Sequence, residues 1–190
     1  MNSFFNYLNE KPNKVSEESV LISTYFMMCR VKSNWYLNTI NPPGGEWNEL
    51  KLKKKNEIIS RSLSKSVSRL DLILQKEKTF ILGEAKEKFA SIVVKKENEK
   101  INKTFKEQKK YIEDILGYKI SPIYLYISAL QDNSEMNEVK LIKRHLDNSE
   151  FSNRIVSLLV LRKNSKIKLV PIFANNADEN IKKTFTEIFS

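Results

Sequence analysis

Two apolar, β-rich runs separated by four polar residues limit the folds open to this chain more than any other feature. The segment reads SRLDLILQKEKTFILGEAKEK over residues 68–88, and "RLDLIL" and "TFILGEAK" are typical of two strands joined by a hairpin turn. Both runs carry charges: Asp71 in the first, and Glu84 and Lys86 at the end of the second. Because burying an unpaired charge is costly, such charges in strands usually have partners or metals that compensate them.

Hairpin geometry predicts that these three charges meet. With a turn of two or four residues, odd-numbered positions of the first strand pair with even-numbered positions of the second. Side chains alternate between the faces of a strand, so Asp71, Glu84 and Lys86 are expected on one face. The opposite face is expected to be apolar, with small residues over which a helix can pack closely; it carries Leu70, Leu72 and Leu74 facing Ile81, Gly83 and Ala85.

The rest of the chain alternates predicted helices and strands. Helices are expected over residues 16–37, 46–63, 93–118, 134–146 and 177–189, and strands over 121–130, 153–161 and 166–174, with a loop at "NPPGG", residues 41–45. A helix is the alternative for 153–161. Gly117 is expected to cap the end of the long helix. This order predicts an α/β fold, a central mixed β-sheet flanked by helices.

Charge and composition narrow the partners and the chemistry. The formal net charge of +10 favours a polyanion, either nucleic acid or an acidic membrane surface. The longest apolar block, "IVSLLVL", is too short to span a bilayer. No long basic amphipathic helix with bulky aromatic residues at its boundary suits a membrane surface, so we expect an intracellular chain without a membrane role. The single Cys29 and single His145 argue against a disulfide framework and multi-histidine metal sites, and His145 is expected on a helix surface.

Two carboxylates and an amine at one strand end suit metal-assisted hydrolysis of a phosphodiester. Asp71 and Glu84 offer the hard oxygen ligands that Mg²⁺ prefers, while the ion keeps several waters and binds a substrate phosphate. The Lys86 amine can orient or deprotonate the attacking water, and in its charged form it can offset developing negative charge. The alternative is a charged hairpin end in which Lys86 pairs with Glu84 or Asp71 at the surface.

Asp71, followed by Glu84-Ala85-Lys86 at the end of an apolar strand and then by a helix, resembles the PD-(D/E)xK nuclease family, with Leu70 where the signature has proline. The resemblance implies a restriction-endonuclease-like fold with four mixed strands, and Mg²⁺-dependent DNA cleavage, with Mn²⁺ substituting. It implies that Asp71, Glu84 and the Ala85 carbonyl are the metal ligands and that Lys86 acts on the attacking water. The catalytic core would span residues 46–130, with 1–45 as a helical extension and 131–190 completing a single domain.

Three further features are weaker candidates. Gln108 falls within the buried stripe of the long helix, so it points either toward the site, where some relatives carry a helical glutamine, or to backbone. Glu57, with Glu49 competing, is the candidate for the third acid that many relatives supply. A row of lysines on another face of the long helix could contact DNA phosphates, although such rows are commonly solvated; it consists of Lys96, Lys100, Lys103 and Lys110.

The sequence therefore predicts a Mg²⁺-dependent DNA endonuclease, prokaryotic, cytoplasmic and of the restriction type, acting on double-stranded DNA. We see no separate recognition module, so the chain is expected either to pair with a second copy or to resemble the small catalytic subunit of a heterodimeric type IIS restriction enzyme, whose partner reads the DNA. The alternatives are a junction resolvase or repair nuclease on the same fold, and a non-catalytic nucleic-acid-binding protein.

Overall fold

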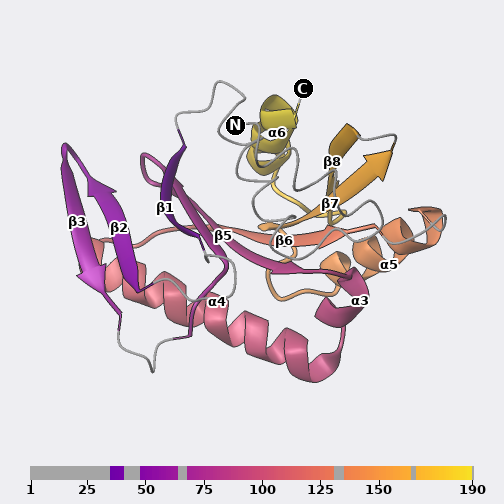
Figure 1. Cartoon of the computed structure of the whole chain (residues 1–190), viewed down its shortest axis with the longest axis horizontal. Helices are drawn as coiled ribbons and strands as arrows, with labels where there is room; N and C mark the ends of the chain where they lie inside the picture. Colours follow the sequence, from indigo (N-terminus) through magenta and orange to yellow (C-terminus); the bar gives the residue numbers. More distant parts are fainter. Residues whose placement is uncertain (1–34, 41–47, 64–67, 131–134, 164–165, 190) are drawn as a thin grey trace.

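A six-stranded mixed β-sheet forms the centre of the molecule (Figure 1). The computed structural model describes residues 35–40, 48–63, 68–130, 135–163 and 166–189. The strands, in spatial order, are β1 (Tyr36–Ile40), β4 (Leu72–Lys76), β5 (Thr79–Lys86), β6 (Ile123–Ala129), β7 (Ile155–Lys163) and β8 (Lys166–Phe173). Neighbouring strands run antiparallel except for the β5–β6 and β6–β7 pairs, which are parallel. The predicted mixed sheet is confirmed, with two strands more than the resemblance implied.

The β4–β5 hairpin has the predicted register. Lys76 pairs with Thr79 across a two-residue turn, and Gln75 pairs with Phe80, so odd positions face even ones. Glu77 in the turn adopts a positive φ of 53°. The ladder ends at the Leu72–Gly83 pair, which leaves Asp71 just beyond β4, in line with Glu84.

Helices cover both faces of the sheet (Figure 1). One face packs against α3 (Phe89–Ile92), α4 (Lys95–Leu116) and α5 (Glu135–Asp147), and the other against α6 (Glu179–Phe189). The predicted helices over 93–118, 134–146 and 177–189 are thus confirmed, and Gly117, with φ 73°, caps α4. No helix in the described part of the chain is both long and apolar enough to cross a membrane.

The predicted helix over residues 46–63 is wrong where the structure describes it, because residues 49–62 form a two-stranded ribbon; residues 46 and 47 lie outside the described residues. We call β2 (Glu49–Lys54), β3 (Glu57–Ser62) and their turn at 55–56 the ribbon. Buried Leu50 and Leu52 alternate with exposed Lys51 and Lys53, the period of a strand with one buried face. Lys55 makes the reversal with a positive φ of 55°.

The predicted helix over 16–37 also needs correction where the structure describes it. Residues 16–34 lie outside the described residues, as does the loop at 41–45. Trp35 is buried, and Tyr36 begins β1, which pairs with β4 at one side of the sheet. Residues 36–40 therefore belong to the sheet and not to a helical extension; an aromatic residue, threonine and isoleucine in "YLNTI" favour a strand.

Both faces of the hairpin are core, contrary to the expectation of one charged and one apolar face. Ile73 and Leu82, on the side of Asp71, pack under α4. Leu70, predicted on the opposite face, belongs to this same cluster. Gly83 makes room for a strand neighbour, since a Cβ there would lie 3.2 Å from the Leu72 Cβ. The charges therefore sit at the strand end of a surface that is otherwise apolar.

Candidate active site

Asp71 is fixed to the end of β5 by a hydrogen bond. Its Oδ2 accepts from the Ala85 N–H at 2.8 Å, and only 8% of the residue is exposed. β4 has no residue in the ladder opposite Ala85, so the carboxylate serves in place of a backbone acceptor. The predicted meeting of Asp71 with the Glu84-Ala85-Lys86 segment is thus present in the structure.

The Ala85 carbonyl belongs to the same edge. The N–H and C=O of one strand residue point to the same side, because such residues exchange both groups with one neighbour. Since the Ala85 N–H points to Asp71, its carbonyl oxygen also faces the place where β4 has ended. The buried methyl group of Ala85 packs in the core of the opposite face.

Glu84 and Lys86 form an ion pair that a third residue joins. The Lys86 Nζ lies 3.0 Å from the Glu84 Oε1 and 3.6 Å from the Glu97 Oε1. The side chains are 12% exposed for Glu84, 20% for Lys86 and 31% for Glu97, so solvent reaches the site. The pairing of Lys86 with Glu84 is the contact that the non-catalytic alternative expected. Glu97, in the first turn of α4, was not predicted.

A network of uncharged polar groups adjoins Glu84. Tyr126 stands opposite Glu84 in the β5–β6 register. Its hydroxyl donates to the Asn102 Oδ1 at 3.2 Å and accepts from the Asn98 amide at 3.2 Å. Burial raises the pKa of the Tyr126 hydroxyl, and the Glu84 charge adds to that shift. The hydroxyl therefore stays protonated and keeps its place as a donor.

His145 extends this network, and its predicted position on a helix surface is wrong. The ring is half-buried, 5.6 Å from the Phe89 ring centroid in an edge-on contact. The Asn98 Nδ2 lies 3.1 Å from the His145 Nε2. Burial lowers the pKa of His145, which favours the neutral ring. The signal in the sequence was helical spacing, since buried Ile142 and Leu146 lie on the same face of α5.

Gln108 lies on the inward stripe of α4, as predicted, and its amide pairs with backbone. The residue is fully buried, and its Nε2 donates to the Ser68 carbonyl. Its Oε1 has no hydrogen-bond partner within the described residues. Gln108 thus holds the segment that leads into Asp71. The stripe around it is buried at Ile101, Phe105 and Ile112 and partly buried at Ile115.

Neither candidate for a third acid joins the site. Glu57 is exposed beside the turn of the ribbon, paired in register with Lys54. The Lys54 Nζ lies close to Gly117 at the end of α4, whereas Glu97, at the start of α4, lies beside Lys86. At 1.5 Å per residue the two ends are about 30 Å apart, so the prediction for Glu57 is wrong.

Glu49 is also placed elsewhere. It is exposed on β2, where its carboxylate lies 3.4 Å from the Lys51 Nζ. The described residues contain no group of three or more histidine, cysteine, aspartate or glutamate side chains arranged to hold a metal. A metal here would rest on two carboxylates.

The donor set nevertheless fits Mg²⁺. Asp71 and Glu84 supply carboxylate oxygens and Ala85 a carbonyl oxygen, all of them hard ligands. Mg²⁺ is commonly held by one or two carboxylates, with waters and substrate phosphates completing its coordination. Two carboxylates at a partly exposed strand end therefore suffice. Mn²⁺ accepts the same oxygen ligands.

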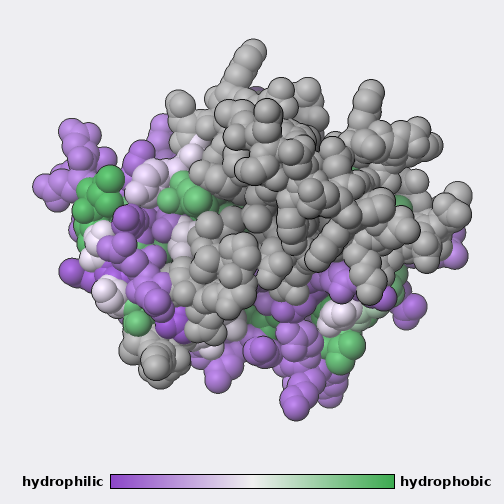
Figure 2. Space-filling view, in the orientation of Figure 1, coloured by the Kyte–Doolittle hydropathy of each residue, from purple (hydrophilic) through white to green (hydrophobic). Residues whose placement is uncertain are grey.

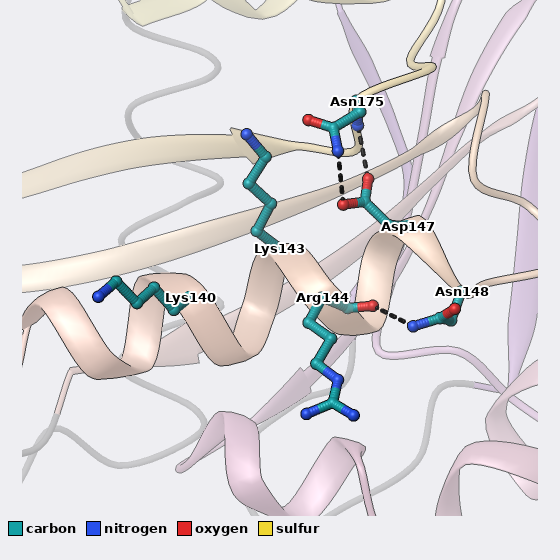
Figure 3. Close-up of a pocket in the computed structure, with 6 residues that line it drawn as sticks. All are labelled: Lys140, Lys143, Arg144, Asp147, Asn148 and Asn175. Atoms are coloured by element: carbon teal, nitrogen blue, oxygen red, sulfur yellow. Dashed lines mark hydrogen bonds between the residues drawn. The ribbon is translucent and has the colours of Figure 1, made fainter.

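Two other cationic surfaces lie outside this site. The lysine row of α4 is exposed, and two of its members form ion pairs, Lys100 with Glu97 at 4.0 Å and Lys103 with Glu107 at 3.7 Å. A surface cavity of about 360 Å³ on α5 is lined by Lys140, Lys143, Arg144, Asp147, Asn148 and Asn175. Figure 3 shows its three cationic side chains pointing in different directions, so they do not converge on one ligand.

Comparison with known proteins adds nothing to this geometry: no protein-family model, curated protein or solved structure matches the chain.

Proposed function

We propose that the chain is a Mg²⁺-dependent DNA endonuclease of the PD-(D/E)xK type with a restriction-endonuclease-like fold. The observation that carries the proposal is the bond from the Ala85 N–H to Asp71, which holds that carboxylate beside Glu84 and Lys86 at the end of one strand. The order of hairpin and following helix supports it, since this is the order that the resemblance implies.

Each residue has a separate task in this proposal. Asp71, Glu84 and the Ala85 carbonyl would hold the ion, which when bound polarises a phosphoryl oxygen and acidifies a water. The Lys86 ammonium orients the attacking water and offsets the negative charge that develops on the phosphate. The amide of Gln108 holds the Ser68 carbonyl and so keeps the approach to Asp71 in place.

Glu97 has a positioning role. The Lys86 ammonium lies between the Glu84 and Glu97 carboxylates. When Glu84 is engaged as a ligand, Glu97 remains to keep Lys86 at the strand end. Glu97 comes from α4 and not from the sheet, so it can hold Lys86 without taking a place among the ligands.

The proposed enzyme is of the restriction type, acts on double-stranded DNA in a prokaryotic cytoplasm, and works with a partner. The partner is a DNA-recognition subunit, as in heterodimeric type IIS restriction enzymes, or a second copy of the chain. A chain that depends on a separate recognition subunit should cut DNA slowly and with little sequence preference when alone.

A non-catalytic nucleic-acid-binding protein is the second candidate, and one observation favours it. Lys86 is paired with both Glu84 and Glu97, which is how a purely structural cluster would neutralise its charges. Such a cluster would neither bind Mg²⁺ nor support cleavage, so the two candidates differ in a measurable way.

Nicking of supercoiled plasmid by the isolated chain tests the proposal. We expect slow nicking that needs Mg²⁺ or Mn²⁺, stops with EDTA and disappears in Glu84→Ala. Glu107→Ala is the matched control, because Glu107-Gln108-Lys109 repeats the same spacing on α4, where Glu107 forms a surface ion pair with Lys103. Equal nicking by wild type and Glu84→Ala would contradict the proposal, and efficient site-specific double-strand cleavage by the chain alone would contradict the recognition-subunit form.

A further inference from the structure

The outer face of the ribbon has the composition of a DNA-contacting surface. Residues directly opposite each other in an antiparallel pair share a face, so Lys51 with Ser60 and Lys53 with Ile58 point the same way. All four are exposed, and Ile58 is 58% exposed. Glu49 shares this face and lies 3.4 Å from the Lys51 Nζ, while the Lys53 Nζ lies 4.3 Å from the centroid of the Tyr36 ring. Lys55 adds a cation at the turn. Figure 2 shows hydrophilic surface with an apolar patch at the left, where Figure 1 draws the ribbon.

The inner side of the ribbon is firmly attached to the domain. Leu50 and Leu52 are fully buried in the core beneath α4. Gln75, 1% exposed, accepts from the Lys53 N–H at 2.9 Å and donates to the Lys53 carbonyl at 2.6 Å. Asn38 donates to the Lys51 carbonyl at 2.5 Å. Buried amide side chains thus satisfy the edge of β2 that faces the sheet, and the outer face is presented on a rigid base.

We infer that the ribbon is a duplex-DNA contact element that enters the major groove with its outer face. The major groove is about 12 Å wide and admits a two-stranded β-ribbon, whose strands lie about 4.8 Å apart. Lysine and serine side chains bind phosphate oxygens and base edges, and an exposed aliphatic side chain can contact a thymine methyl group. The ribbon supplies all three kinds of side chain.

Charge selects DNA over a second copy of the chain as the occupant. β3 pairs with β2 alone among the described strands, and an open edge can in principle pair with another chain. A second copy seated on the outer face would bring its own Lys51, Lys53 and Lys55 against the same lysines, and such juxtaposed like charges are costly. The same lysines attract a polyanion, in keeping with the net charge of +10.

This inference rests on the proposed function for the choice of DNA among polyanions. The ribbon turn lies near the end of α4 and the Lys86 cluster near its start, about 30 Å apart along the helix. One helical turn of B-DNA covers about 34 Å, so a single duplex is long enough to reach both places.

Binding of a fluorescein-labelled, random-sequence duplex, measured by anisotropy in EDTA over a range of salt concentrations, tests the inference without cleavage. The triple variant Lys51→Gln, Lys53→Gln, Lys55→Gln is expected to lose affinity about tenfold or more, and the slope of log K against log salt should fall by about one per lost phosphate contact. The matched control removes three cations from α5: Lys140→Gln, Lys143→Gln, Arg144→Gln. It should change the affinity only about two- to threefold, through net charge alone.

A single substitution, Ser60→Asp, tests the same face without relying on the triple variant to fold. It leaves every lysine in place and adds one negative charge to the outer face, and it should also weaken binding. The inference is overturned if wild type does not bind the duplex, if single-stranded DNA binds equally well, or if the ribbon and α5 triple variants lose equal affinity. Loss of cleavage in Glu84→Ala with full duplex binding would leave the ribbon assignment intact, so the two proposals fail separately.

Discussion

Substitution of Asp71 separates the structural role of this carboxylate from its proposed role as a ligand. Its Oδ2 accepts a hydrogen bond from the N–H of fully buried Ala85. Asp71→Ala leaves that N–H without its acceptor, which costs about 1–3 kcal/mol. For a domain of this size, 1 kcal/mol shifts Tm by about 2–4 °C, so Asp71→Ala should melt about 2–12 °C below wild type in EDTA.

Asp71→Asn can keep an acceptor oxygen at the same place, but it removes the charge and replaces the second carboxylate oxygen with an NH2 donor. A neutral acceptor is weaker than a charged one, but the substitution also relieves repulsion between Asp71 and Glu84. We therefore expect Asp71→Asn to melt within about 4 °C of wild type in EDTA, a loss of at most about 1 kcal/mol.

In EDTA, Asp71→Asn should resemble wild type, whereas its response to Mg²⁺ should resemble that of Asp71→Ala. At a Mg²⁺ concentration of about 100 times Kd, binding stabilises wild type by about 2.7 kcal/mol, a rise in Tm of about 5–11 °C. Neither Asp71→Asn nor Asp71→Ala should show this rise. Thermal unfolding with and without Mg²⁺ measures both effects. An Asp71→Asn protein that Mg²⁺ stabilises as much as wild type would refute the ligand role, and an Asp71→Ala protein as stable as wild type in EDTA would refute the structural one.

Three further predictions concern the ribbon, the end of α4 and the polar network. Gln75→Leu removes the hydrogen-bond partner of the Lys53 N–H and of the Lys53 carbonyl, a loss of about 1–3 kcal/mol in total. Amide hydrogen exchange at Lys53 should accelerate about ten- to a hundredfold. Unchanged exchange would contradict the attachment of β2 through Gln75. Burial of Glu113 opposes its ionisation, but the Ile120 N–H and neighbouring lysines outweigh burial and lower the pKa from 4.5. The stability advantage of wild type over Glu113→Gln, present at pH 7, should therefore shrink as the pH falls below 4.5, whereas a constant difference in unfolding free energy would refute this. Burial lowers the pKa of His145 from 6.5, so below pH 6.5 the unfolded chain takes up a proton that the folded chain does not; His145→Gln should lose less stability than wild type between pH 6.5 and 5, and equal losses would contradict the burial effect.

The hairpin and its charges were predictable because local chemistry and tertiary structure agree there. Two apolar runs around a polar turn have few alternatives to a hairpin, and strand alternation then brings Asp71 to the face of Glu84 and Lys86. The long helix and the buried strand after it were predictable for the same reason: helical period, a capping glycine and a continuous apolar run each favour one structure.

The ribbon was not predicted because lysines obscure its alternation. "KLKKK" is rich in residues with good helix propensity, and only Leu50 and Leu52 carry the period of a strand. With this segment expected as a helix, Glu57 was expected on that helix, as a third acid near Asp71. As part of β3, Glu57 lies beside the turn of the ribbon instead. Tertiary contacts determine the strand structure of this segment: its leucines are buried in the core, and amide side chains bind the edge of β2.

The Glu97 contact and the polar network join separate elements, and the network residues Asn98, Tyr126 and His145 are also far apart in sequence. No spacing rule links Lys86 with the first turn of α4, and Tyr126 meets Glu84 only through the β5–β6 register. His145 was within reach of sequence reasoning through its spacing from apolar neighbours on α5. Its flanking charges in "KRHL" favoured the wrong, exposed position.

Metal binding tests the central claim most directly, because it needs neither a partner subunit nor a substrate sequence. Calorimetric titration of Mg²⁺ and Mn²⁺ into wild type, Glu84→Ala and Glu107→Ala, each with and without duplex DNA, compares the proposed ligand with the chance match on α4. We predict binding by wild type and Glu107→Ala and none by Glu84→Ala. If Glu84→Ala binds as wild type does, or if wild type binds no metal even with DNA present, the charges at the end of β5 are structural and the nuclease assignment is wrong.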